Sequence, residues 1–228
     1  FECFLLKNLR PPNVVELVGV VWDVSMLACL LEFVSNGTLG EWLYRDGKNT
    51  RGDDKLSWKD PLLKVAQQVA LGVQYLHHSR YFDEENECWK DQIIHRDLKP
   101  SNLLLTDQFN MKLSDFGESR ALDADITMTV TGTPIYMAPE IIKRERYDSK
   151  VDVYSFGICL VAMCKLAKSV TEFFFAGIKK ELSQNGSGFG AVSLEHLNYH
   201  LVQKNWRPRL PRSVPSSIRR LIDDCWSE

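Results

Sequence analysis

The chain has 228 residues, of which 44% are hydrophobic, 11% aromatic and 25% charged, and this composition is typical of a globular protein. It excludes intrinsic disorder, collagen-like repeats and a coiled coil, and the length predicts one large domain or two lobes. Lys and Arg number 28 against 30 Asp and Glu, so the net charge of −2 leaves no excess of cations, and we expect no nucleic-acid partner.

No segment of the sequence is apolar over a membrane thickness. The longest apolar run, residues 157–164, is far shorter than the roughly 20 residues of a membrane-spanning helix, so we expect no membrane span. The six cysteines are scattered without Cys-x-x-Cys spacing, which predicts reduced, buried thiols in an intracellular protein rather than disulfides or metal ligands. The first residue is Phe and no signal peptide is present, so we expect the chain to begin inside a longer protein.

The first third of the chain predicts a helix, a strand pair and two further helices. Residues 1–10 read as the end of an amphipathic helix, stopped by Pro11 and Pro12, because proline cannot continue the helical hydrogen bonding. Two β-rich runs, 14–22 and 26–33, predict an antiparallel pair. A short helix is expected over 38–43. A long helix capped by Ser57, with Asp60 as its capping-box partner, is expected to run to residue 76.

The remaining elements are predicted from shorter signals. Residues 79–92 form an acidic, aromatic insertion that we interpret as a solvated loop, with a partner-docking surface as the alternative. Short strands are expected at 103–105 and 111–113, followed by an extended loop to Glu140. Four helical patterns follow, at 151–166, 171–184, 193–203 and 214–226. Strands followed by helices favour an α+β fold in two unequal lobes.

Three motifs carry the functional signal. Residues 94–102 read Ile-His-Arg-Asp-Leu-Lys-Pro-Ser-Asn, residues 115–117 read Asp-Phe-Gly, and residues 138–140 read Ala-Pro-Glu. In order and spacing they resemble the catalytic loop, the metal-binding triplet and the end of the activation segment of protein kinases. Three motifs in register are specific, whereas any one of them alone is weak.

The resemblance implies a role for each polar residue. Phosphoryl transfer requires in-line positioning and neutralisation of charge on the transferred group. Asp115 and Asn102 would therefore bind Mg²⁺, for which hard oxygen ligands are suited. Asp97 would accept the proton of the substrate hydroxyl, and Lys99 would reach the γ-phosphate of ATP. Lys99 and Thr133 both match serine/threonine kinases, so protein substrates with Ser or Thr acceptors are expected.

Further matches concern the nucleotide and the lobe contacts. The resemblance aligns Glu2 with the helix glutamate that pairs with the ATP-anchoring lysine, although a solvated Glu near a chain end is the alternative. It places Leu31 at the gatekeeper and Glu32 to Val34 at the hinge, with Leu104 among the nucleotide-binding residues. The other matched residues are an apolar stack between the lobes and a buried helix aspartate: Leu6, Leu17, His95, Phe116 and Asp152.

The resemblance covers essentially the whole chain and divides it into two parts. Residues 1–34 would be a partial N-terminal lobe, with the end of one helix, two strands and the hinge. Residues 35–228 would be the mostly helical C-terminal lobe without its last helix. The glycine-rich loop and the ATP-anchoring lysine have no counterpart in the sequence, so we expect the 228 residues alone to be inactive and the full protein to be an active cytoplasmic or intracellular kinase using ATP and Mg²⁺. The motif at residues 206–208, Trp-Arg-Pro, resembles the tyrosine-kinase-like group.

Two other functions stay open at this stage. A pseudokinase or truncated kinase that serves as a binding scaffold is the main alternative, against which the intact Asp97 and Asp115 motifs weigh. A small-molecule kinase is disfavoured by the complete activation segment. Within that segment Thr129 is a candidate phosphorylation site that Arg96 could bind, with solvated loop threonines as the alternative.

Overall fold

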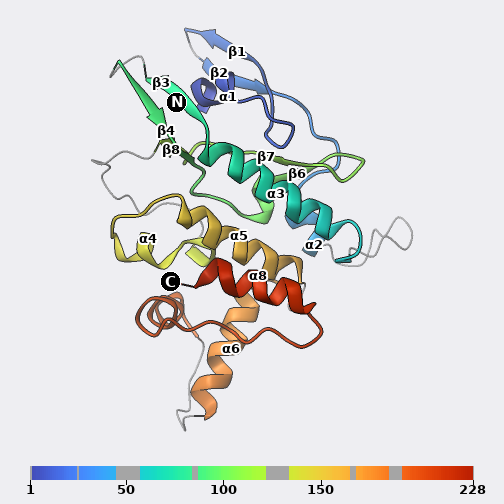
Figure 1. Ribbon diagram of the computed structural model, residues 1–228, viewed down its shortest axis with the longest axis vertical. Coiled ribbons are helices and arrows are strands. Elements are labelled where there is room, and N and C mark those ends of the chain that lie inside the picture. The colour runs from blue at the N-terminus through green and yellow to red at the C-terminus, as the bar shows by residue number, and fades with distance from the viewer. Residues whose placement is uncertain are drawn as a thin grey trace. The chain divides into compact units, whose positions relative to one another are not determined.

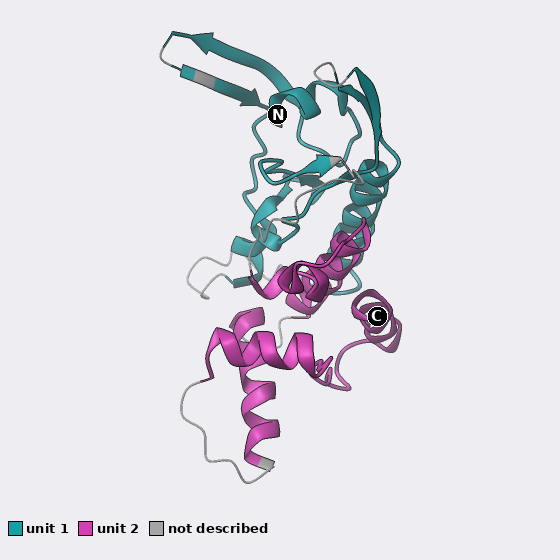
Figure 2. Ribbon diagram, turned by 90° about the vertical axis from the view of Figure 1, so that its left-hand side faces the viewer, with its two compact units in different colours: residues 1–126 teal, residues 127–228 magenta. Residues whose placement is uncertain are grey.

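The structure is a computed structural model that describes residues 2–24, 26–44, 57–83, 87–121, 134–164, 168–184 and 192–227. The chain divides into two compact units, residues 1–126 and residues 127–228 (Figure 2). The lobe boundary predicted after Val34 is a functional division and stays a prediction.

Unit 1 begins with a short helix and a hairpin (Figure 1). Helix α1 (Glu2–Asn8) ends ahead of Pro11 and Pro12, as predicted, and buries Leu5 and Leu6. Strands β1 (Leu17–Asp23) and β2 (Met26–Leu31) pair antiparallel, with a register shift between Leu17 and Gly19. The predicted strand pair is therefore confirmed, with slightly shorter strands.

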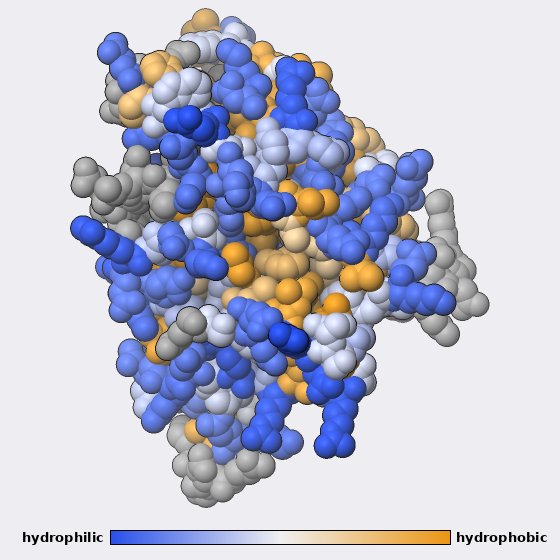
Figure 3. Space-filling view, viewed as in Figure 1, coloured by the Kyte–Doolittle hydropathy of each residue, from blue (hydrophilic) through white to orange (hydrophobic). Residues whose placement is uncertain are grey.

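Apolar side chains are exposed on the β1–β2 hairpin. Orange atoms lie among blue ones in the upper part of Figure 3, where Figure 1 draws these strands. The exposed apolar residues of the hairpin, its turn and the segment just after it are Val18, Val20, Val21, Trp22, Val24, Met26, Leu30 and Phe33. Eight large apolar side chains are thus exposed within residues 18–33.

Helix α3 (Leu62–His77) is the main helix of unit 1 and follows the shorter helix α2 (Leu39–Tyr44). Its apolar residues recur every three or four positions and share one buried face: Leu62, Val65, Ala66, Val69, Val73 and Leu76. Burial of each large side chain contributes roughly 1.5–3 kcal/mol relative to exposure. The predicted cap is wrong: Ser57 and Asp60 form a separate turn, and Pro61 occupies the N-cap position.

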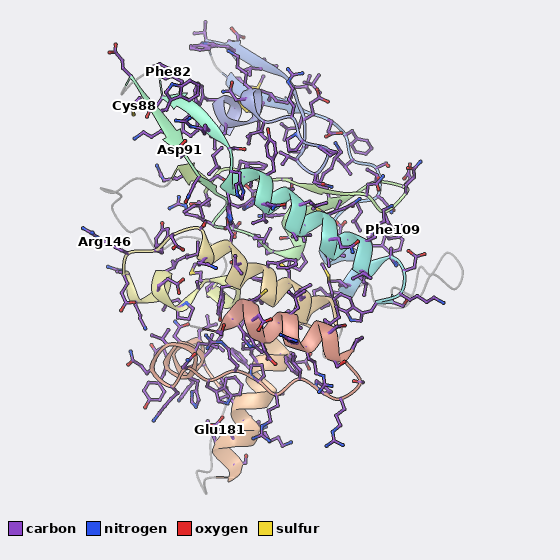
Figure 4. The ribbon with its side chains drawn as sticks, in the orientation of Figure 1. Phe82, Cys88, Asp91, Phe109, Arg146 and Glu181 are labelled. Carbon is purple, nitrogen blue, oxygen red and sulfur yellow. A yellow bond between two sulfur atoms is a disulfide. The ribbon has the colours of Figure 1, made fainter. Side chains whose placement is uncertain are left out.

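The acidic insertion folds as a β-hairpin rather than as a loop. Strands β3 (Arg80–Asp83) and β4 (Cys88–Asp91) pair antiparallel, and the Gln92 N–H donates to the Ser79 carbonyl over 3.1 Å at the base. Tyr81 is buried, and its ring meets the Phe4 ring edge-on at 5.6 Å. Phe82, Cys88 and Asp91 of this hairpin are labelled in Figure 4. Cross-strand pairing explains the difference: Tyr81 packs inward, while Phe82 pairs with Trp89 on the opposite, exposed face.

Two short strand pairs and a turn complete unit 1. Strands β6 (Leu103–Leu105) and β7 (Met111–Leu113) pair antiparallel with the predicted bounds, and α3 packs against β7. Strand β5 (Ile93–Ile94) pairs with β8 (Arg120–Ala121). A 3₁₀ turn, η1 (Pro100–Asn102), lies between β5 and β6.

Unit 2 is helical, as predicted. Two short turns, η2 (Pro134–Tyr136) and α4 (Pro139–Lys143), lead into α5 (Lys150–Met163), in which twelve of fourteen residues are buried. Helix α6 (Val170–Gln184) follows, then α7 (Leu194–Asn198) with a π-helical continuation η3 (Tyr199–Gln203), and α8 (Ser216–Trp226). Helix α8 packs its buried face, Ile218, Ile222, Cys225 and Trp226, on α5.

One expectation about the cysteines is wrong. Cys3 of α1 and Cys29 of β2 form a disulfide, with 5.9 Å between their Cα atoms. The other four cysteines are free thiols, and those of Cys159 and Cys225 are buried. Across the described ranges, none of the helices combines the length and the apolar character that a bilayer crossing requires.

Candidate functional site

The predicted catalytic loop starts from the buried strand β5. Ile93 and Ile94 fix this strand in the core, and His95, Arg96 and Asp97 follow as buried polar residues. Arg96 has a positive φ of 65° and donates through Nε to the Glu118 carbonyl. This contact ties the loop to the segment just after residues 115–117.

The Asp97 side chain is held through one of its two carboxylate oxygens. Its Oδ2 accepts from Lys99 Nζ over 2.6 Å and from Asn102 Nδ2 over 3.0 Å. Asn102 Nδ2 also donates to the Asp97 carbonyl over 2.9 Å. Asp97 Oδ1 is buried, and within the described ranges no group hydrogen-bonds to it. The carboxylate is therefore oriented and charge-compensated through one oxygen, while the other oxygen keeps its capacity to accept a proton.

The same contacts orient Asn102. Because its Nδ2 donates twice to Asp97, its Oδ1 is left as an acceptor, within 3.4 Å of the Ser101 hydroxyl. An amide oxygen with this freedom is a suitable hard ligand for Mg²⁺. Turn η1 provides the geometry, since Pro100 starts it and the Asn102 N–H donates to the Lys99 carbonyl over 2.9 Å.

Asp115 is connected to this loop through its neighbour. The Ser114 backbone N–H and hydroxyl both donate to the Asn102 carbonyl at 3.0 Å, and His95 Nε2 lies 3.1 Å from the Ser114 carbonyl. Asp115 has a φ of 63° and an exposed side chain, whereas Phe116 is fully buried beside the His95 ring at 5.1 Å. The left-handed backbone lets the two successive side chains point to different environments.

The donor set fits a magnesium nucleotide. Among the described residues, no three His, Cys, Asp or Glu side chains gather as a metal site on their own. Mg²⁺ in nucleotide sites is held by one or two protein oxygens, completed by phosphates and water, so Asn102 and Asp115 suffice.

The predicted hinge is fixed to both neighbouring sheets. The Glu32 N–H donates to the Glu16 carbonyl over 2.9 Å, and a Glu32 carboxylate oxygen accepts from the Glu16 N–H over 2.8 Å. The same carboxylate forms an ion pair with Lys112 of β7, whose partner across the strand pair is Leu104. After the hinge, the Asn36 N–H donates to the Leu105 carbonyl over 3.0 Å. Leu31 and Val34 flank Glu32 on either side and are half-buried.

Three of the predicted functional residues have side chains outside the described part of the chain. Glu2 belongs to α1, but its side chain lies outside the described residues, as do Thr129 and Thr133 entirely. The sequence reading missed Ser114 and Lys112. Their signal was weak, because a serine or lysine near the Asp-Phe-Gly triplet has no diagnostic spacing of its own.

A separate cavity of about 730 Å³ lies in unit 2, lined by residues that include Glu140, Tyr154 and Arg207. Arg207 donates to the Leu201 and Trp226 carbonyls, both at 3.2 Å, and lies over the Tyr154 ring at 5.4 Å. Burial raises the pKa of Tyr154 to about 12, with Arg207 opposing the rise and Glu140 adding to it. No hydrogen-bond partner for the Tyr154 hydroxyl exists in the part of the chain that the structure describes.

Comparison with known proteins gives matches over the entire chain. The family described as "Protein kinase domain" matches residues 1–228. A putative serine/threonine-protein kinase/receptor of Acanthamoeba polyphaga mimivirus is 34% identical over 227 residues, which cover 99% of this chain and 11% of that protein. In Arabidopsis thaliana, the serine/threonine/tyrosine-protein kinase HT1 is 32% identical over 231 residues (100% of this chain, 49% of that protein). Serine/threonine-protein kinase CTR1 is 29% identical over 228 residues (99% and 24%). The chain thus spans half or less of the length of each of these relatives.

Proposed function

This chain belongs to the protein kinase domain family and has its α+β fold, and from that premise we propose that the protein transfers the γ-phosphate of ATP to Ser or Thr hydroxyls of protein substrates. The observation that carries the proposal is Asp97, with Oδ2 held by Lys99 and Asn102 and Oδ1 buried and unpartnered among the described residues.

Asp97 acts as the acceptor of the substrate proton. Its free Oδ1 hydrogen-bonds the incoming hydroxyl and aims that oxygen at the phosphorus, and the proton moves to Oδ1 as the new bond forms. Lys99 balances the carboxylate charge through Oδ2 while Asn102 fixes the rotation of the carboxylate. Positioning of this kind contributes a large share of the acceleration in phosphoryl transfer.

Asn102 and Asp115 hold the metal of the nucleotide. When bound, ATP with Mg²⁺ supplies the phosphoryl group and the cation that neutralises its oxygens. The Ser114 contacts to the Asn102 carbonyl keep the two ligand-bearing segments at one distance from each other. By the kinase resemblance, Leu31, Glu32 and Val34 of the hinge, together with Leu104, would hold the adenine. Glu2 would pair with the ATP-anchoring lysine, and Thr133 would act with the catalytic residues.

The substrate class and location follow the same premise. Lys99 supports Ser or Thr acceptors in proteins, and so do the relatives, which are named as serine/threonine-protein kinases. Since ATP is an intracellular substrate, we place the activity in the cytoplasm or in the intracellular part of a larger protein. We propose the same Ser or Thr acceptors for the whole protein, of which this chain is the kinase domain.

The test uses the full-length protein, its Asp97→Asn variant and ATP labelled at the γ-phosphate. We expect transfer to a degenerate Ser/Thr peptide mixture by the wild type and a loss of about 10³-fold in Asp97→Asn, with ATP affinity kept within about twofold. Phosphoamino-acid analysis identifies the acceptor. Unchanged transfer in Asp97→Asn overturns the role of Asp97, and ATP binding without any transfer in the wild type favours the scaffold function.

A further inference from the structure

The single disulfide in the described residues joins helix α1 to strand β2. Cys3 follows Glu2 in α1, and Cys29 lies two residues before Leu31 in β2, opposite Val20 of β1. The Cα atoms are 5.9 Å apart, a usual separation for a disulfide, so the backbones of helix and strand already accommodate the bond. The sulfur atoms are drawn in yellow in Figure 4.

This cysteine pair is more accessible than the two buried thiols, Cys159 and Cys225. Cys3 and Cys29 are both half-buried, which leaves them within reach of small oxidants and reductants. Cys159 is fully buried, and burial raises the pKa of its thiol far above the ordinary value. Burial also raises the pKa of Cys225 to about 11. Both buried thiols therefore stay protonated and unreactive at neutral pH.

The disulfide limits the movement of helix α1 relative to strand β2. Helix α1 buries Leu5 and Leu6 in unit 1, and β2 continues directly into Glu32, which Lys112 and Glu16 hold. A covalent link at Cys3 restricts how far α1 can move from the strand that leads into the hinge. Disulfides in reducing compartments are usually transient and regulatory, and a protein that consumes ATP works in such a compartment.

We propose that Cys3 and Cys29 form a reversible thiol–disulfide modification site, oxidised by peroxide and reduced by a thiol such as glutathione, whose state sets the nucleotide affinity by tethering α1 to β2. The link to nucleotide affinity rests on the proposed function, whereas the modification site does not.

Peroxide oxidises the cysteine pair in two steps. The thiolate of one cysteine attacks a peroxide oxygen, which breaks the O–O bond and gives a sulfenic acid and water after proton uptake. The second thiol attacks that sulfur, the S–S bond forms, and a second water leaves with the hydroxyl group. The two sulfurs lose two electrons in total and peroxide gains them. Reduction proceeds by thiol exchange through a mixed disulfide.

The experiment uses the full-length protein treated with dithiothreitol or with hydrogen peroxide, then alkylated and mapped by mass spectrometry. We expect a linked peptide pair containing Cys3 and Cys29 after peroxide, and two alkylated thiols after dithiothreitol. Binding of a fluorescent ATP analogue should be at least about fivefold tighter in the oxidised wild type, the lower end of common coupling between sites. Cys3→Ser and Cys29→Ser should lose this difference, while Cys88→Ser, another half-buried cysteine of unit 1, should keep it.

The outcomes separate the two proposals. Absence of the linked peptide at millimolar peroxide overturns the modification site. A linked peptide with equal ATP-analogue affinity in both states of the wild type overturns the control of nucleotide binding, and this comparison needs no variant to fold. A reversible linked peptide in a protein that binds no nucleotide in either state upholds the modification site and overturns the proposed function.

Discussion

Lys112 forms an ion pair with Glu32, a residue 80 positions earlier in the chain, and thereby joins strand β7 to the segment that follows β2. Lys112 lies three residues before Asp115, so one side chain connects the predicted hinge with the strand that leads to the predicted metal ligand. Both side chains are largely shielded from water, with exposed fractions of 19% and 26%, so the pair is screened less than a surface pair.

Replacement of Lys112 by Met should weaken nucleotide binding. Loss of the pair leaves the Glu32 carboxylate held by the Glu16 N–H but no longer tied to β7, which loosens the hinge. We expect the KM for ATP to rise about fivefold, corresponding to about 1 kcal/mol, with kcat nearly unchanged. Lys112→Arg should recover most of the affinity. The exposed Lys179→Met in α6 is the matched control, and an equal effect of both Met variants would contradict the role of Lys112.

Two substitutions at Asn102 separate its two contacts. Asn102→Ala removes both the oxygen ligand and the donor to Asp97, so the Mg²⁺ concentration for half-maximal activity should rise about tenfold and kcat should fall. Asn102→Asp keeps a metal-binding oxygen but removes the N–H donor and adds a like charge beside Asp97. We expect its Mg²⁺ requirement to stay near that of the wild type while kcat falls. Steady-state kinetics across a Mg²⁺ titration measure both, and a Mg²⁺ requirement that is equal in all three proteins would argue against Asn102 as a ligand.

Gly157 permits the close approach of α5 and α8. A Cβ at this position would lie 2.7 Å from Cys225 Cβ, which is attached directly to the backbone and cannot rotate away. Gly157→Ala gains about 1 kcal/mol of helix propensity but overpacks the interface by about 1–3 kcal/mol. We expect a net loss in the free energy of unfolding, measured by chemical denaturation. Gly19→Ala, whose Cβ would meet nothing within 4 Å, should not destabilise the protein.

Stability above pH 10 should depend on Tyr154. The unfolded side chain ionises near pH 10, whereas burial raises the folded pKa to about 12. The stabilising contribution is therefore complete below pH 10 and is lost as the pH rises from 10 to 12, amounting to roughly 1 kcal/mol by pH 11.

The matched variants are Tyr154→Phe and the half-exposed Tyr199→Phe. Tyr154→Phe also removes a buried hydroxyl without a partner among the described residues, so we expect no loss of stability at pH 8. Denaturation between pH 8 and 11 should give a flatter profile for Tyr154→Phe than for wild type or Tyr199→Phe. Parallel profiles in all three proteins would contradict the assignment.

Periodic patterns within short segments were sufficient to predict the helices and strands that those segments form. The apolar period of α3 and the two runs around residues 107–110 were sufficient for α3, β6 and β7, and the spacing of the three motifs identified the fold. The hairpin of β3 and β4 was not predicted, because Tyr81 and Phe82 are adjacent and neither four-residue strand alternates apolar with polar residues.

Contacts between residues far apart in the chain could not be predicted from the sequence. The Cys3–Cys29 bond depends on how α1 lies against β2, and the Lys112–Glu32 pair depends on the placement of β7 beside the hinge. In both pairs, the residues around one partner contain no motif that identifies the other partner. Asp97, Lys99 and Asn102 lie within a stretch of six residues, so their proximity was predictable, whereas the ion pair of Lys99 with Asp97 was not predicted.

The hairpin of β3 and β4 leaves and rejoins unit 1 at neighbouring points, since Ser79 and Gln92 are hydrogen-bonded to each other. A segment whose two ends meet in this way can be lengthened, shortened or exchanged without moving the helix before it or the strand after it. Variation of size among homologous chains, and the grafting of foreign peptides, should therefore be tolerated between residues 80 and 91 as long as the buried Tyr81 and its contact with Phe4 are kept.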